Sequence, residues 1–130
     1  MTAPAVRIVL DTSAVLAYAV TSIHVGDTIA EVSDEGAQFG VSVLCLAEAT
    51  RLVKDDNAPG VELLVQHPHC VVLPVLAEDW QYLAHLTKML GRTDLAVSLG
   101  EALDRDAFVL TSEPERYELP GQGELPIIPV

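Results

Sequence analysis

The chain has 130 residues, and half of them are hydrophobic. This length is enough for one domain with a substantial core. No apolar run approaches the roughly 20 residues that cross a bilayer, so we expect no membrane-spanning segment. The net charge of −12, with only seven Lys and Arg, argues against binding nucleic acid through a basic surface. A carboxylate cluster that holds divalent cations is the exception, because the bound metal presents positive charge to a phosphate. Cys45 and Cys70 lie in apolar segments, which favours free thiols over a disulfide and predicts a cytoplasmic protein.

The first predicted strand, residues 6–10, is a short run of mostly β-branched side chains, typical of a strand buried on both faces of a parallel sheet. It ends at Asp11, and the following Thr12 and Ser13 favour a helix over residues 14–19. Asp11 is therefore interpreted either as a group at the ligand-binding edge of the sheet or simply as the cap of this helix.

Helices and strands alternate through the middle of the chain. The expected elements are an amphipathic helix over residues 24–36, a strand over 38–43, a helix from residue 44, a short helix over 61–66 and a strand over 70–76. Glu48 lies about one turn into the helix that follows the second strand. Pro74 indicates that the third strand lies at an edge of the sheet or ends in a bend.

The last third of the chain continues the same alternation. The expected elements are a helix over residues 77–90 with Trp80 inward, a helix capped by Thr93 or Asp94 that runs to about residue 105 with Leu103 inward, a strand over 108–110, and a last strand at Ile127, Ile128 and Val130. Gly91 is expected to end the first of these helices, and Ser112 with Glu115 forms a capping-box pattern.

This alternation predicts a single α/β domain over residues 1–130, a three-layer α/β/α sandwich with a mainly parallel central sheet of four or five strands. Four acids then lie at one edge of the sheet, because they follow strand ends or begin helices: Asp11, Glu48, Asp94 and Glu113. Each acid alone is explained equally well by helix capping or the helix dipole. Together, four unpaired carboxylates would repel one another, so we expect a cation, and oxygen ligands without a Cys or His set indicate Mg²⁺ or Mn²⁺.

Three segments resemble the PIN domain, the fold of the VapC-type toxin ribonucleases. LDTSAVLAYA is similar to its opening strand and Asp, VSVLCLAEATR to the second strand and the helix with the Glu, and GRTDLAVSLGEALDRDAFVLTSEPERY to the segment with the third and fourth acids. The resemblance covers nearly the whole chain. It implies a Mg²⁺- or Mn²⁺-dependent endoribonuclease that cleaves single-stranded RNA, as the toxin of a toxin–antitoxin pair. In that interpretation Asp11, Glu48 and Asp94 are the metal-binding catalytic acids, and Glu113 stands where the family usually has Asp.

The resemblance and the sequence also indicate residues that line the substrate. These are Thr12, Ser13, Thr111, Arg92 and Arg116. The hydroxyls match polar positions of the family's site, where they could orient water. Either Arg could contact a flanking phosphate, although solvent exposure or an ion pair with a nearby acid is the role that the sequence favours for both.

The resemblance further implies a homodimer and an antitoxin partner whose basic residues reach into the acidic site, which the acidic surface would suit. The same acidity and the Glu at position 113 favour an alternative function, a catalytically weak or inactive PIN-fold module that binds RNA or protein. His67, His69 and Cys70 resemble a zinc-site fragment, but the second ligand pair is missing, which favours a loop.

Overall fold

A parallel β-sheet forms the centre of the computed structural model, which describes residues 4–130. Within these residues the sheet has five strands, all parallel, in the order β3-β2-β1-β4-β5. The strands are β1 (Val6–Leu10), β2 (Gln38–Ser42), β3 (Cys70–Leu73), β4 (Phe108–Thr111) and β5 (Ile127–Pro129). Each expected strand is present. β3 is an edge strand, as Pro74 indicates, but it ends at Leu73 rather than at residue 76, because Pro74 cannot donate to the ladder.

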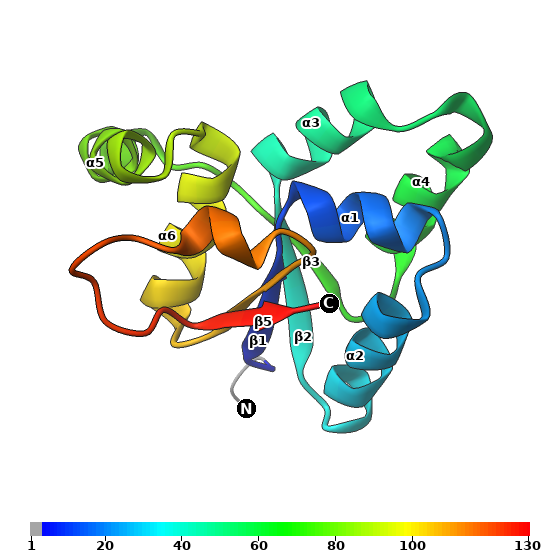
Figure 1. Ribbon diagram of the computed structural model, residues 1–130. Helices are drawn as coiled ribbons and strands as arrows, with labels where there is room; N and C mark the ends of the chain where they lie inside the picture. The colour runs from blue at the N-terminus through cyan, green and yellow to red at the C-terminus, as the bar shows by residue number, and fades with distance from the viewer. Residues whose placement is uncertain (1–3) are drawn as a thin grey trace.

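Helices cover both faces of this sheet. They are α1 (Thr12–Ala19), α2 (Ile23–Asp34), α3 (Val43–Leu52), α4 (Ala58–Gln66), α5 (Trp80–Leu90) and α6 (Thr93–Arg105), with the short 3₁₀ helices η1 (Asp55–Asn57), η2 (Ala77–Asp79) and η3 (Pro114–Tyr117). Helices α1 to α4 lie on one side of the sheet and α5 and α6 on the other (Figure 1). The predicted three-layer α/β/α architecture is confirmed.

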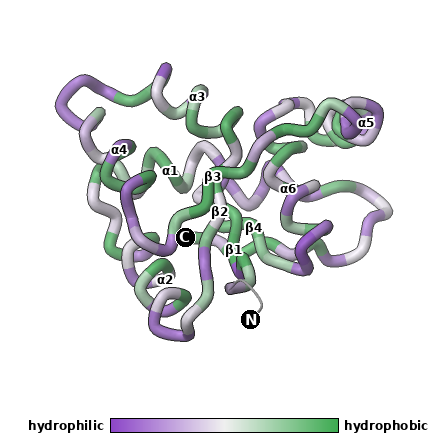
Figure 2. The backbone as a smooth tube through the Cα atoms, turned by 180° about the vertical axis from the view of Figure 1, so that it is seen from behind, coloured by the Kyte–Doolittle hydropathy of each residue, from purple (hydrophilic) through white to green (hydrophobic). Residues whose placement is uncertain are grey.

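The last three residues of β1, Ile8, Val9 and Leu10, are buried, as the apolar run predicts, whereas Arg7 near its start is exposed. The strand is predominantly hydrophobic along its length (Figure 2). Ile8 and Leu10 pack into the core under α1 to α4, whereas Val9 packs into the core that α6 covers with Leu95 and Leu99. Side chains alternate across a strand, so a strand between two helical layers needs an apolar residue at nearly every position.

The strand order places a switch point at the middle of the sheet. The chain adds β2 and β3 on one side of β1 and then crosses to add β4 and β5 on the other side. Open parallel sheets bind ligands beyond the carboxyl ends of the strands at such a point. Asp11 follows β1 directly and Glu113 lies just beyond β4, so the fold brings both acids to the carboxyl edge of the sheet at this point.

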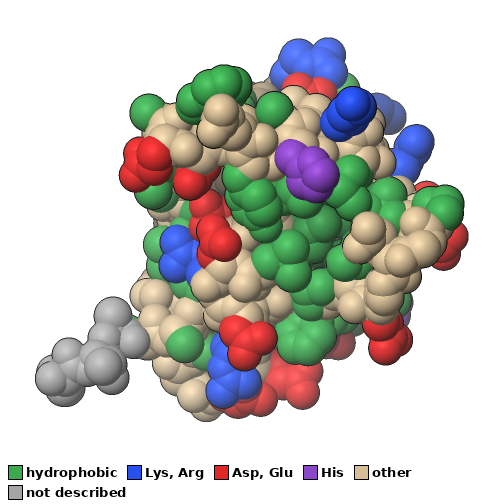
Figure 3. Space-filling model, turned by 90° about the vertical axis from the view of Figure 1, so that its left-hand side faces the viewer, with side chains coloured by type: hydrophobic (Ala, Val, Ile, Leu, Met, Phe, Trp, Pro, Cys, Tyr) green, Lys and Arg blue, Asp and Glu red, His purple; other side chains and the backbone are tan. Residues whose placement is uncertain are grey.

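Two side chains that the helical periodicity placed inward are exposed instead. Trp80 is 67% exposed and Leu103 is 45% exposed. Helix α5 packs against α6 rather than against the sheet, so only part of its circumference, including Leu86, is covered. The face that carries α5 and α6 accordingly shows hydrophobic side chains at its surface (Figure 3). Periodicity identifies the apolar stripe of a helix, but it does not tell how much of that stripe a neighbouring element buries.

The start of α6 also differs from the expectation. The helix begins at Thr93, and Arg92, in extended conformation, occupies the capping position. Gly91 ends α5 as predicted, with a positive φ of 84° that reverses the chain between the two helices. Asp94 lies in the first turn of α6, where its carboxylate is available to other partners.

The capping box predicted from Ser112 and Glu115 is wrong. The 3₁₀ helix η3 begins at Pro114 without a side-chain cap. Instead the backbone N–H of Ser112 donates to Ser13 Oγ at 2.9 Å and that of Glu113 donates to Thr111 Oγ1 at 3.0 Å. Hydroxyls from the start of α1 and the end of β4 therefore fix the segment that carries Glu113.

Both cysteines are free thiols, as expected from their apolar surroundings. Burial raises the pKa of the Cys45 thiol, and it raises the pKa of Cys70 to about 11. Neither thiol is therefore an activated nucleophile at neutral pH.

In residues 4–130 no helix combines the length and the apolar character that crossing a bilayer requires.

Candidate active site

Asp11 is a completely buried carboxylate at the end of the central strand. Its Oδ1 accepts hydrogen bonds from the backbone N–H of Ala14 at 3.0 Å and from Ser13 Oγ at 2.6 Å. Its Oδ2 accepts one from the hydroxyl of Tyr117 at 2.8 Å. The capping interpretation of Asp11 is confirmed, and the residue lies at the switch point of the sheet, where its role at a ligand-binding edge stays a prediction. All these donors are neutral, and among the described residues no Lys or Arg forms an ion pair with this carboxylate.

Tyr117 is a site residue that the sequence does not reveal. Its side chain is 2% exposed, and its hydroxyl reaches Asp11 from η3, more than a hundred positions away in the chain. Burial and the neighbouring Asp11 charge raise the pKa of Tyr117, so its hydroxyl remains a proton donor. An aromatic residue in a short helical turn predicts packing, and no local pattern indicates which polar atom its hydroxyl will meet.

Asp94 is held by a cation and a hydroxyl. Arg92 Nε donates to Asp94 Oδ1 at 3.1 Å, and Arg92 Nη2 donates to Oδ2 at 2.7 Å. Thr12 Oγ1 donates to the same Oδ2 at 2.7 Å, which ties the start of α1 to the start of α6. Burial alone would raise the pKa of Asp94, but the hydrogen bonds from Arg92 and Thr12 bring it below its usual value. Asp94 is therefore ionised at neutral pH.

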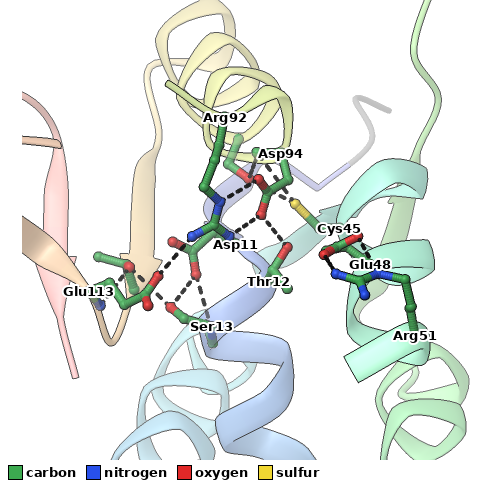
Figure 4. A network of polar contacts seen from close by, with 12 residues as sticks. Asp11, Thr12, Ser13, Cys45, Glu48, Arg51, Arg92, Asp94 and Glu113 are labelled. Atoms are coloured by element: carbon green, nitrogen blue, oxygen red, sulfur yellow. Dashed lines mark hydrogen bonds and ion pairs between the residues drawn. The ribbon is translucent and has the colours of Figure 1, made fainter. Parts of the chain in front are cut away.

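Arg92 also contacts Glu113, so one guanidinium bridges two of the proposed ligands. Its Nη1 lies 3.5 Å from Glu113 Oε2. The side chain runs between Asp94 and Glu113 toward Asp11 (Figure 4). The hydrogen bonds to Asp94 raise the pKa of Arg92 further above its already high value, so this cation is permanent.

Glu48 faces a different partner. It forms an ion pair with Arg51, one turn further along α3, and this hydrogen bond lowers the pKa of Glu48. Glu48 nevertheless lines a cavity of about 310 Å³ together with Arg92 and Asp94. The structure thus brings Glu48 to the rim of the site, with its carboxylate turned toward Arg51 (Figure 4).

The predicted hydroxyls belong to the same network. Ser13 Oγ donates to Asp11 and lies 3.1 Å from Thr111 Oγ1, so it joins the ends of β1 and β4. Arg116, by contrast, is exposed on η3 and forms no ion pair with any described residue. The residues that one polar network connects are Asp11, Thr12, Ser13, Arg92, Asp94, Thr111 and Glu113.

The donor atoms fit a hard divalent cation, but they are not arranged as a ready metal cage. Carboxylate and hydroxyl oxygens are the ligands that Mg²⁺ and Mn²⁺ prefer. Across the part of the chain that the structure describes, no three Asp, Glu, His or Cys side chains form a cluster that could hold a metal. The expectation of four unpaired converging acids is therefore corrected, because Arg92 and Arg51 neutralise three of them.

Comparison with solved structures identifies the fold. The chain is similar to a chain in the crystal structure of VapBC2 from Rickettsia felis bound to a DNA fragment from their promoter, with a TM-score of 0.71 and 13% sequence identity. The similarity covers 94% of this chain and 97% of that chain. The chain has a PIN-like fold. No protein-family model matches the sequence, and no curated protein is similar to it at a significant level. At this identity the likeness shows the PIN-like fold alone.

The Tyr117 hydroxyl should contribute measurably to stability in this PIN-like fold. Tyr117→Phe removes one oxygen and leaves Asp11 Oδ2 without the hydrogen bond that the hydroxyl donates. A buried charged acceptor that loses its donor costs roughly 1–3 kcal/mol, so the free energy of unfolding should fall by that amount in urea titrations with EDTA. Tyr82→Phe on α5 is the control, because Tyr82 is 38% exposed, and it should stay within about 0.5 kcal/mol of wild type. Equal stabilities of the two variants would contradict the role given to this hydroxyl.

Proposed function

We propose that this chain is a metal-dependent endoribonuclease that cleaves single-stranded RNA. The supporting observation is the fully buried Asp11 carboxylate at the switch point of a PIN-like fold, joined by one polar network to Asp94 and Glu113. A buried carboxylate whose hydrogen-bond donors are all neutral carries a large desolvation cost. A divalent cation beside Asp11 offsets that cost, so the site favours a bound metal.

The acids that would hold the ion are Asp11, Asp94 and Glu113, with Glu48 at the rim. In such sites Mg²⁺ or Mn²⁺ polarises the scissile phosphate and lowers the pKa of a bound water for in-line attack. The chain's own hydroxyls do the positioning, since Ser13 and Tyr117 fix the Asp11 carboxylate and Thr12 fixes Asp94. A rigid carboxylate set is what metal-assisted hydrolysis needs from the protein.

RNA would reach this site with little help from the rest of the surface. With 19 Asp and Glu against seven Lys and Arg, non-specific attraction of a polyanion is weak. Arg116 is exposed on η3, three positions after Glu113, and is available to contact a phosphate that flanks the cleaved bond, whereas Arg92 is held by Asp94 and Glu113. The proposed enzyme should therefore depend on metal for substrate binding as well as for chemistry.

The partners follow from the same proposal. The similar solved structure is a VapBC2 assembly on promoter DNA, which supports a toxin–antitoxin context for this chain. We propose a homodimer and a basic antitoxin whose cationic side chains neutralise the acidic site. The strongly negative charge suits such a partner, and the free thiols suit the reducing cytoplasm.

Cleavage of an unstructured RNA during a Mn²⁺ titration tests the proposal. Asp94→Asn should lower kcat/KM by about tenfold or more, because disturbing even the outer contacts of a metal site commonly costs that much. Glu101→Gln is the matched control, since Glu101 is also on α6 and also pairs with an Arg, Arg105 at 3.0 Å, and it should keep wild-type activity. Cleavage that persists in EDTA, or that Asp94→Asn leaves unchanged, would refute the proposal.

The ion pairs in the site favour one second candidate. Arg92 and Arg51 neutralise three of the four acids, as in a site that has no need of a metal. A catalytically inactive PIN-fold module that holds RNA or protein would have this arrangement. Absence of cleavage at every Mn²⁺ concentration, together with retained RNA binding, would select this candidate.

A further inference from the structure

We propose that Arg92 is an internal counter-ion of the candidate site and competes with a divalent cation for Asp94 and Glu113. The inference rests on the proposed metal-dependent function and extends it, because it makes metal affinity a property that one residue of this chain controls. Its consequence is that the metal binds only when the guanidinium leaves the two carboxylates.

The contacts of Arg92 are those of a specific ligand rather than of a solvated surface cation. It binds Asp94 in a bidentate fork through Nε and Nη2 and uses its remaining terminal nitrogen, Nη1, toward Glu113. Fork-shaped pairs of this kind are among the stronger charge-assisted hydrogen bonds. All three nitrogens of the guanidinium are thus directed at carboxylates that the proposed function assigns to the metal.

The location of Arg92 allows it to leave. It precedes α6 in extended conformation, and its side chain is 37% exposed beside the 310 Å³ cavity. Because the pair opens onto this cavity, the side chain has room to turn away from Asp94 when a divalent cation takes its place. The helices and the sheet need not move for Asp94 to become free.

The charge distribution gives the expected direction of the effect. Without Arg92, Asp94 and Glu113 would face the buried Asp11 with no positive charge beside them, and their repulsion would rise. A divalent cation would then be the sole compensation and would bind without displacing anything. Removing the guanidinium should therefore tighten metal binding and weaken the metal-free fold.

Calorimetric titration of Mn²⁺ into wild type, Arg92→Gln and Arg105→Gln tests the inference. Arg92→Gln should bind Mn²⁺ about tenfold more tightly than wild type, because it loses one strong competing pair. Arg105→Gln removes an Arg–carboxylate pair from the same helix and should bind as wild type does. In EDTA, Arg92→Gln should also melt at a lower temperature than Arg105→Gln, and saturating Mn²⁺ should close that gap.

The possible results distinguish the counter-ion role of Arg92 from the proposed metal-dependent function. Measurable Mn²⁺ binding with equal affinity in wild type and Arg92→Gln overturns the counter-ion role and leaves the proposed function standing. No binding in any variant overturns both. If Arg92→Gln does not fold, Arg92→Lys decides, because it keeps the charge but loses the fork, and it must bind Mn²⁺ more tightly than wild type does.

Discussion

Replacing Asp11 by Asn should give a folded protein that has lost nearly all cleavage of RNA. The carboxylate is the one acid of the site that no Arg or Lys neutralises among residues 4–130, so it is the ligand on which a bound metal most depends. Metal ions contribute several kcal/mol of charge stabilisation in the transition state. Losing that contribution corresponds to a decrease in kcat/KM of about 10²–10³-fold.

The fold should tolerate this substitution because Asn preserves the capping geometry. Its side-chain oxygen can still accept from the N–H of Ala14, and Asn is about as good as Asp at a helix N-cap. The change also removes a buried charge whose hydrogen-bond donors are all neutral. In EDTA the free energy of unfolding should therefore equal that of wild type within about 0.5 kcal/mol or exceed it.

Activity and stability must be measured on the same preparations. Asp27→Asn provides a charge-matched control, because Asp27 is exposed on α2, away from the switch point, and this variant should keep both properties. Mn²⁺ should raise the melting temperature of wild type and of Asp27→Asn but not of Asp11→Asn. Wild-type cleavage by Asp11→Asn would mean that the activity arises from a contaminant or from another site.

The fold could be predicted because its signals are local. A few neighbouring residues are enough to indicate the apolar run of β1 and the end of α5 at Gly91. The alternation of strands with helices follows from such local patterns. Parallel strands also share one carboxyl edge, so the placement of Asp11 and Glu113 at the same edge of the sheet follows from topology. Side-chain identity at a strand end is thus enough to propose a site.

An ion pair of Arg92 with a nearby acid is among the roles expected from the sequence, and it is confirmed. The contacts that depend on tertiary approach could not be predicted. Arg92 and Asp94 are close in sequence, but the second acid that Arg92 contacts, Glu113, is 21 positions away and is brought near by the fold. The bond from Tyr117 to Asp11 requires η3 to fold back over the sheet edge. No repeating pattern of residues in the sequence indicates such contacts.

A second large effect is expected at the contact between α1 and α4, where Gly60→Ala should destabilise the fold. A Cβ at position 60 would lie 2.7 Å from the Cα and from the carbonyl oxygen of Ala19, the last residue of α1. Backbone atoms cannot rotate away as a flexible side chain would, so the two helices must separate. Overpacking of this kind typically costs up to about 3 kcal/mol.

Helix propensity opposes this effect and decides how large the net loss is. Ala is better than Gly inside a helix by about 1 kcal/mol, so the free energy of unfolding of Gly60→Ala should fall by about 2 kcal/mol in urea titrations. Gly26→Ala isolates the propensity term, because Gly26 is inside α2 and a Cβ there meets nothing within 4 Å. That control should gain up to about 1 kcal/mol. If both variants gain stability, α1 and α4 do not pack as closely as the structure has them, and the support that α4 gives to the helix capped by Asp11 would have to be reconsidered.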